Sequence, residues 1–146
     1  MARREPRSPW RVAVRCARGY PQVIASPPLL DDGTPFPTWL YLVCPVLCKA
    51  CATLEAEGLM AALDERLAHD ADLRARLLET DARFRAGRAA EARVCGQDPA
   101  AAPGADTGLV GQADPLTTTK CLHAHVAYAL ADLGDPLGAE VLRMTR

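Results

Sequence analysis

The sequence predicts one α+β domain, in which a small N-terminal antiparallel sheet precedes a mostly helical body of four to five helices. The chain has 146 residues, enough for one domain of ordinary size. Hydrophobic residues make up 49% of the chain but aromatic residues only 5%, and Ala, Leu and Val carry most of the apolar mass. This composition favours helices over a β-sandwich. Strand-like alternation precedes residue 44, and helical periodicity follows it.

Three short strands are expected in the first part of the chain, at residues 10–16, 21–26 and 39–43. Val12 and Val14 would share one face of the first strand, because side chains alternate across a sheet. Gly19 suits the turn of a hairpin between the first two strands. The third strand, WLYLV, follows the proline-rich PFPT segment, whose prolines enforce extended backbone.

Five helices are expected after the strands, at residues 45–57, 59–69, 71–94, from 117–119 to about 134, and from 136 to about 144. Pro45 suits the first position of a helix, and Gly58 suits the position after its end. Asp70 or Asp72 can cap the third helix. Asp135, followed by proline, marks the start of the last helix.

The helix expected at residues 71–94 has a thin apolar stripe, formed by Leu73, Leu77 and Phe84. Acidic and basic residues four apart cover much of its remaining surface, which is typical of a solvated helix. We therefore expect this helix to be largely exposed and either to project or to meet a partner. A helical protein-interaction module, with purely structural cysteines, is thus an alternative function.

The ends and linkers of the domain are marked by composition. Residues 1–9 are expected to form a basic disordered arm, residues 10–146 the single domain, and residues 96–114, rich in Gly, Pro, Ala and Asp, a flexible loop. The net charge of −1 does not favour nucleic acid as a partner.

No signal peptide and no apolar run long enough for a membrane span are visible in the sequence. The expected location is therefore the cytoplasm. Cysteines stay reduced there, so metal or thiol chemistry is favoured over a disulfide framework.

Three of the six cysteines, Cys44, Cys48 and Cys51, have the C-x3-C-x2-C spacing of the iron–sulfur motif in radical enzymes. A chain of this size cannot supply the large barrel that surrounds such a cluster. Cys48 and Cys51 are therefore interpreted as small core residues. Cys44 would sit at the start of a helix, where the helix dipole stabilises a thiolate.

The segment KCLHAH contains Cys121, His123 and His125 within five residues. On a regular helix Cys121 and His125 share a face, whereas His123 points away. Two arrangements remain open. Either Cys121 pairs with His125, or the helix begins late and Cys121 and His123 form its irregular first turn.

A metal site needs three or four ligands, and no local pattern here provides them. We therefore predict a site assembled across the fold, in which zinc or iron would be the metal, with the ligands Cys44, Cys121, His123 and His125. A thiol-dependent enzyme with Cys44 or Cys121 as nucleophile is a second alternative. Cys16 and Cys95 have no partner at ligand spacing and are interpreted as ordinary thiols.

The segments PFPTWLYLVCP, LEAEGLM and KCLHAHVAYALA together resemble the bacterial domain-of-unknown-function family five-hundred-one, which is common in actinobacteria. The resemblance extends roughly from Pro21 to the C-terminus and implies a cytoplasmic bacterial protein. Because the family has no assigned activity, it implies no catalytic residues. Its motif matches the chain at Cys44-Pro45 and at Lys120 to His123 but does not fix Cys48, Cys51, Cys95 or His125. The resemblance therefore favours Cys44, Cys121 and His123 over the other cysteines and His125 as site residues.

Overall fold

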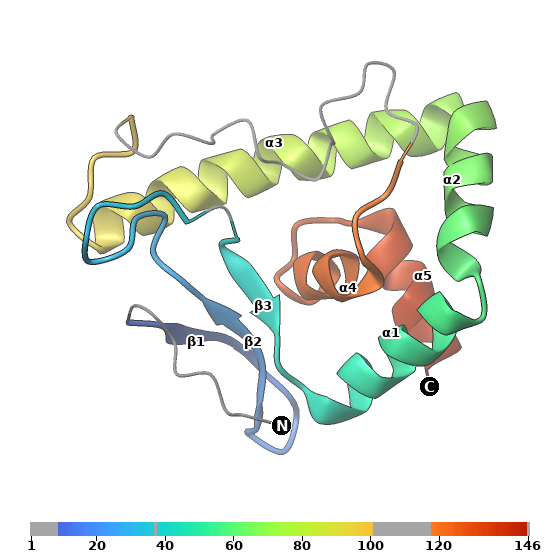
Figure 1. Ribbon diagram of the computed structural model, residues 1–146, viewed down its shortest axis with the longest axis horizontal. Coiled ribbons are helices and arrows are strands. Elements are labelled where there is room, and N and C mark those ends of the chain that lie inside the picture. The colour runs from blue at the N-terminus through green and yellow to red at the C-terminus, as the bar shows by residue number, and fades with distance from the viewer. Residues whose placement is uncertain (1–8, 37, 101–117, 146) are drawn as a thin grey trace.

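A computed structural model describes residues 9–36, 38–100 and 118–145 of the chain (Figure 1). It confirms the α+β class, with a three-stranded antiparallel sheet followed by helices. The strands pair in the order β1-β2-β3 and comprise β1 (Arg11–Arg15), β2 (Pro21–Ala25) and β3 (Leu40–Leu42). The predicted arm lies outside the described residues except for Pro9, as does the 101–114 part of the predicted loop.

The described helices are α1 (Pro45–Ala56), α2 (Leu59–His69), α3 (Ala71–Val94), α4 (Leu122–Leu130) and α5 (Pro136–Met144). Pro45 opens α1, and Gly58 links α1 to α2 in the left-handed conformation, with φ of 89°. The Asp70 side chain accepts the Leu73 N–H at 2.8 Å and so caps α3. The start signals that were read from the sequence therefore operate in the structure.

Helix α4 begins at Leu122, later than the predicted 117–119, and ends at Leu130 rather than near residue 134. The Thr119 N–H and hydroxyl both bind the Asp64 carboxylate in α2, at 2.7 and 2.8 Å. The Leu122 N–H donates to Glu55 in α1 at 2.8 Å. Long-range acceptors thus replace an earlier helical turn. At the other end, Asp132 adopts φ of 60°, which stops the helix.

The helices and the sheet surround α4 (Figure 1). Helix α4 packs against β3 on one side and against α5 and α1 on others. One apolar cluster joins the helices through residues such as Cys51, Leu67 and Leu122. A second joins the sheet to α3 and α4 through Trp39 and Phe84. The first turn of α4 is therefore fixed from several sides.

The apolar stripe of α3 is buried within the chain, contrary to the expectation of a largely exposed helix. Leu73, Leu77 and Phe84 are 5%, 2% and 1% exposed. Figure 1 shows α3 lying along one side of the molecule, from the loops at the end of the sheet to α2. The stripe is thin, but its large side chains pack into the two apolar clusters that the other elements form. The interaction-module alternative therefore loses its main support.

Polar side chains of α3 are also buried, although the sequence suggests a solvated face. Arg88 is 4% exposed and donates to the Phe36 carbonyl at 3.0 Å. Glu91 is 3% exposed and accepts from Arg11 and from the Trp39 indole N–H. Burial of these charges is tolerated because each has a polar partner. They tie α3 to β1 and to the segment between β2 and β3.

The described start of the predicted loop is held in place. The Gln97 amide donates to the Leu29 carbonyl at 2.8 Å and accepts the Leu29 N–H at 3.1 Å. This pair of hydrogen bonds resembles the pairing of two strands and joins the end of α3 to the segment after β2.

None of the helices in the described ranges is both long and apolar enough to cross a membrane.

Candidate metal centre

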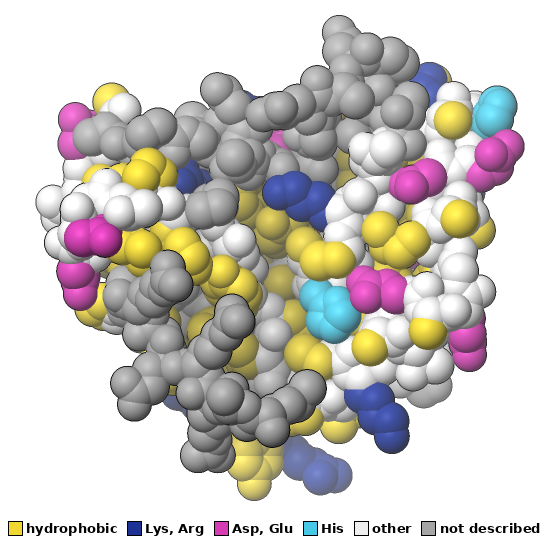
Figure 2. Space-filling model, in the orientation of Figure 1, with side chains coloured by type: hydrophobic (Ala, Val, Ile, Leu, Met, Phe, Trp, Pro, Cys, Tyr) yellow, Lys and Arg dark blue, Asp and Glu magenta, His cyan; other side chains and the backbone are white. Residues whose placement is uncertain are grey.

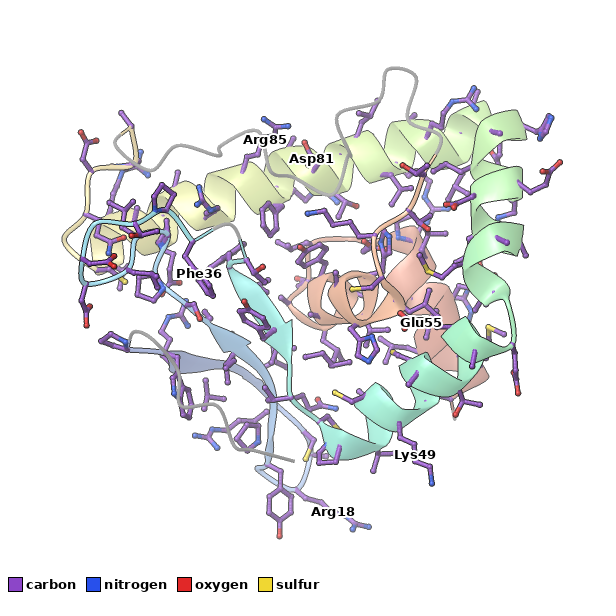
Figure 3. All side chains as sticks on the ribbon, viewed as in Figure 1. Arg18, Phe36, Lys49, Glu55, Asp81 and Arg85 are labelled. Atoms are coloured by element: carbon purple, nitrogen blue, oxygen red, sulfur yellow. The ribbon has the colours of Figure 1, made fainter. Side chains whose placement is uncertain are left out.

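A cluster of three potential metal ligands lies where α1 meets the first turn of α4. It consists of Glu55, Cys121 and His123, each of which offers one ligand atom, and these atoms all lie within 4.8 Å of one another. Figure 3 labels Glu55 at the end of α1 that faces α4. The structure thus brings together two residues of the predicted site and adds a carboxylate from a distant part of the chain.

Glu55 is positioned by two contacts with α4. Its Oε1 accepts the Leu122 N–H at 2.8 Å and lies 3.3 Å from Nδ1 of His123. The first N–H groups of a helix have no partner within the helix, and the dipole there favours negative charge. Glu55 therefore caps α4 from a neighbouring helix, which holds its carboxylate beside the ligand atoms of Cys121 and His123.

Cys121 is the residue that precedes α4, and its backbone is extended, with φ of −56° and ψ of 150°. Its carbonyl accepts the Ala124 N–H at 3.0 Å, so the first helical turn is formed around it. Its thiol makes no capping hydrogen bond and the residue is exposed. Because the helix begins late, Cys121 and His123 can face the same point. This is the second of the two arrangements that the spacing left open.

The site is accessible from solvent. The side chains of His123 and Glu55 are 33% and 27% exposed. Figure 2 shows a histidine next to an acidic side chain on this face of the molecule, among hydrophobic side chains. An ion or small molecule could therefore reach the cluster without unfolding the chain.

Two neighbouring groups have shifted acid–base properties. Burial lowers the pKa of Lys120, although nearby Cys121 and Asp81 oppose this effect. Burial raises the pKa of Cys51 to about 11, and the charges of Glu55, Cys48 and Cys121 add to the shift. Cys51 precedes Glu55 by one turn of α1 and is fully buried, in agreement with its interpretation as a core residue.

His125, another predicted ligand, lies in the core and outside the cluster. It is 1% exposed, and its Nδ1 lies 2.8 Å from Oδ2 of the buried Asp135. The second Asp135 oxygen accepts the Gly138 N–H and caps α5. Nε2 of His125 is buried and has no hydrogen-bond partner among the described residues. This histidine joins α4 to α5.

Cys44 precedes α1 and is half-buried, without a capping hydrogen bond. Among the described residues it belongs to no group of three ligands within bonding reach of one ion. Its electrostatic neighbour is Cys48, whose pKa is raised by burial and then by Cys44. The Cys48 thiol donates to the Leu42 carbonyl, with 3.5 Å between sulfur and oxygen. Cys44 and Cys48 thus mark the corner between β3 and α1.

Sequence reasoning missed Glu55. Residue type alone does not distinguish it from Glu57 at the end of the same expected helix. One signal could have found it. Glu55 lies four residues after Cys51 and therefore on the same face of the helix as that buried residue. An acidic residue on the same helix face as a buried residue is a candidate for a contact with another part of the chain.

The three ligand types suit a borderline transition metal. Cysteine sulfur, imidazole nitrogen and carboxylate oxygen are all zinc ligands, and imidazole and carboxylate also suit iron. Glu55, Cys121 and His123 could hold such an ion and would leave one position of a tetrahedral site for water or another ligand.

Comparison with known proteins identifies a family but no characterised relative. No curated protein and no solved structure matches the chain. The profile of a family described as protein of unknown function (DUF501) matches residues 12–143, a span that includes all three residues of the cluster. The chain therefore belongs to the DUF501 family.

Proposed function

We propose that this protein binds one transition-metal ion, zinc or iron, through Glu55, Cys121 and His123. The observation that carries the proposal is the mutual distance of at most 4.8 Å among their ligand atoms. In a tetrahedral zinc site with bonds of about 2.0–2.3 Å, ligand atoms lie roughly 3.5 Å apart. Small side-chain rotations are enough to close that difference.

The cap on α4 and the metal bond are compatible. The Glu55 contacts with Leu122 and His123 both use Oε1, and a carboxylate has a second oxygen that can bind an ion. The contact of Glu55 with the Leu122 N–H orients the carboxylate as groups behind a metal ligand commonly do. The site is thus partly organised before an ion enters.

Three protein ligands and one open position characterise catalytic zinc sites more than closed structural ones. An ion bound here would lower the pKa of its water toward about 7 and polarise a carbonyl or phosphoryl oxygen. The solvent-accessible position of His123 and Glu55 supports this use.

The test is metal titration of the purified, chelator-treated full chain with Zn²⁺, followed by isothermal calorimetry. One ion per chain is expected. Glu55→Gln, Cys121→Ser and His123→Gln should each weaken binding by at least about tenfold, since even groups that only orient a ligand are worth about 10–100-fold. Cys95→Ser and His69→Gln are matched controls, because both residues are exposed and outside the cluster. Unchanged binding in all three cluster variants would overturn the proposal.

The same titration tests the wider ligand set predicted from sequence. Cys44→Ser should leave zinc affinity unchanged if Glu55 replaces Cys44 as a ligand. A loss equal to that of Cys121→Ser would show that Cys44 moves into the site when metal binds. His125 cannot be tested this way alone, because its buried pair with Asp135 also supports the fold.

A second candidate function is thiol chemistry at Cys121. The observation in its favour is the exposed sulfur at the start of α4, next to His123 and Lys120. The thiolate is the reactive form, and burial and Glu91 raise the pKa of Cys95, the other exposed cysteine. Alkylation by iodoacetamide at neutral pH, mapped by mass spectrometry, should then be faster at Cys121 than at the exposed Cys95. Equal rates would remove this candidate.

A cytoplasmic location is also proposed. All six cysteines lie in the described residues, and none forms a disulfide, which fits a reducing compartment. Fractionation of cells that express a tagged full chain tests it, and recovery with membranes or in the medium would contradict it.

A further inference from the structure

A buried thiol belongs to α1, the helix that brings Glu55 to Cys121. Cys51 is 0% exposed and belongs to the same apolar cluster as Leu122, the residue after Cys121. It lies one helical turn before Glu55, whose carboxylate is within 4.8 Å of the Cys121 sulfur. Cys121 is one of the neighbours that raise the pKa of Cys51, after burial and the charge of Glu55. One thiol is thus exposed just before α4, and the other is buried in α1, which packs against α4.

We propose that Cys121 and Cys51 form a reversible disulfide in response to a hydroperoxide, and that this reaction regulates the metal centre. Solvent access divides the roles. Cys121 can meet the oxidant, whereas the buried Cys51 cannot. Cys51 would resolve the oxidised Cys121, an arrangement common in redox-sensing cysteines.

The reaction has two balanced steps. The Cys121 sulfur attacks one peroxide oxygen, the O–O bond breaks, and Cys121 becomes a sulfenic acid while the rest of the peroxide leaves as water or an alcohol. The Cys51 sulfur then attacks the Cys121 sulfur, the S–O bond breaks, and the hydroxyl leaves as water with the Cys51 proton. The peroxide gains two electrons and the thiol pair loses two.

Formation of the bond requires the two cysteine side chains to approach each other. A disulfide needs Cβ atoms about 3.5–4.5 Å apart. The Cys121 side chain is the part that can rotate, because the residue is exposed and its thiol makes no capping hydrogen bond. A disulfide would remove the sulfur ligand from the metal centre, and a bound ion would shield Cys121 from peroxide. This consequence rests on the proposed metal site, whereas disulfide formation itself does not.

The chain sequence makes the product easy to identify. Trypsin cleaves after Lys and Arg, so Cys51 is the only cysteine in peptide 50–66 and Cys121 the only one in peptide 121–143, while Cys44 and Cys48 share peptide 19–49. The metal-free, reduced full chain would be treated with hydrogen peroxide at one equivalent, alkylated and digested without reductant. A linked 50–66/121–143 peptide is expected.

Variants define the two roles. Cys51→Ala should abolish the linked peptide and leave a sulfenic acid on Cys121, which a 1,3-dicarbonyl reagent traps. Cys48→Ala, one turn earlier on the same helix, should behave as the wild type. A link from peptide 121–143 to 19–49, or oxidation of Cys121 with free Cys51 in the wild type, would overturn the proposal. The linked peptides of the oxidised wild-type chain test the proposal even if Cys51→Ala fails to fold.

A zinc-loaded sample separates this proposal from the proposed function. Zinc should slow formation of the linked peptide. If the link forms but zinc neither binds nor protects, the metal site is wrong and the disulfide stands. If one zinc ion binds per chain but no Cys51–Cys121 link forms on oxidation of the metal-free chain, the disulfide is wrong and the metal site stands.

Discussion

Two histidines, two residues apart in α4, have opposite environments. His123 is one-third exposed and lies beside Glu55 of α1, whereas His125 is 1% exposed and lies beside Asp135 at the start of α5. Residues two apart point to nearly opposite sides of a helix. One therefore reaches the surface near α1, and the other is enclosed between α4 and α5.

The two histidine–carboxylate pairs have one feature in common. Each acid also accepts the N–H of a helix start, Glu55 from Leu122 and Asp135 from Gly138. The exposed pair has a cysteine next to it and room for an ion, while the buried pair is enclosed by the core. A histidine–carboxylate contact can thus stabilise structure or prepare a ligand set. Solvent access and a third ligand distinguish the two.

Removal of the buried acid should have the largest effect. Asp135→Ala leaves His125 without its partner and α5 without its cap. A buried polar group left without its partner costs about 1–3 kcal/mol and a lost cap about 1 kcal/mol, together a large part of a typical stability of about 5–15 kcal/mol. Urea unfolding followed by circular dichroism measures this loss.

The matched control is Asp135→Asn, which keeps an oxygen for the Gly138 N–H and should cost less than the alanine variant. Where Asp135→Ala still folds, zinc stoichiometry should be unchanged. A stability loss below about 1 kcal/mol, the value of an ordinary hydrogen bond, would contradict the structural role assigned to His125.

Gly138→Ala should have the next largest effect. A Cβ at this position would lie 1.9 Å from the His125 carbonyl oxygen, so α4 and α5 would have to separate. Overpacking of this kind costs typically about 1–3 kcal/mol. Thermal unfolding of the variant measures the cost. A control is Gly19→Ala, where nothing lies within 4 Å and only the positive φ is strained. An equal effect at both positions would show that close packing of α4 on α5 is unimportant.

Local signals predicted much of the fold because local chemistry determines it. The limits of α2 and α3 agree with the prediction, since Gly58 adopts the left-handed conformation and Asp70 makes the expected cap. The strands were predicted in the right places but one residue too long at most ends. The α3 surface was misjudged because Arg88 and Glu91 find partners far away in the chain, at the Phe36 carbonyl and at Arg11 of β1.

The candidate site was only half predictable, since its decisive contacts span long stretches of chain. Cys121 and His123 stand out by residue type and spacing. Glu55 is 67 residues before Leu122, whose N–H it accepts, and no local pattern links them. The late start of α4, which lets Cys121 and His123 face one point, depends on that contact and on Asp64 holding Thr119.

A smaller effect on stability is expected from the exposed pair. Glu55→Ala removes the cap of α4 and should cost about 1 kcal/mol, the usual value of a lost cap, while it also abolishes zinc binding. Glu55→Gln keeps an oxygen for the Leu122 N–H and should retain most of the stability but still weaken zinc binding. The two variants therefore separate capping from metal binding. Equal loss of stability in both would show that the negative charge stabilises α4.

The smallest effect is expected at the exposed ion pair that joins α2 to α5. Arg66 holds Glu140 with two hydrogen bonds, at 3.0 and 2.8 Å, and both side chains are about one-third exposed or more, at 42% and 31%. Arg66 lowers the pKa of Glu140 below its ordinary value of 4.5. Solvent screening limits such a pair to about 0.2–1 kcal/mol. The stability contribution of this exposed pair is the reference for that of the buried His125–Asp135 pair at the start of the same helix.

Glu140→Gln should therefore lower stability slightly at neutral pH, and the difference from the wild type should depend on pH in a defined direction. A carboxylate whose pKa is lowered by folding stabilises the protein above the unfolded pKa, and this contribution is lost as pH falls through the folded pKa. The variant and the wild type should thus converge below pH 4.5, the ordinary carboxyl value. High salt should reduce the difference as well. Urea unfolding at neutral pH and at acid pH measures both, and a difference that persists in acid would show that packing of the Glu140 side chain, and not its charge, stabilises this end of the molecule.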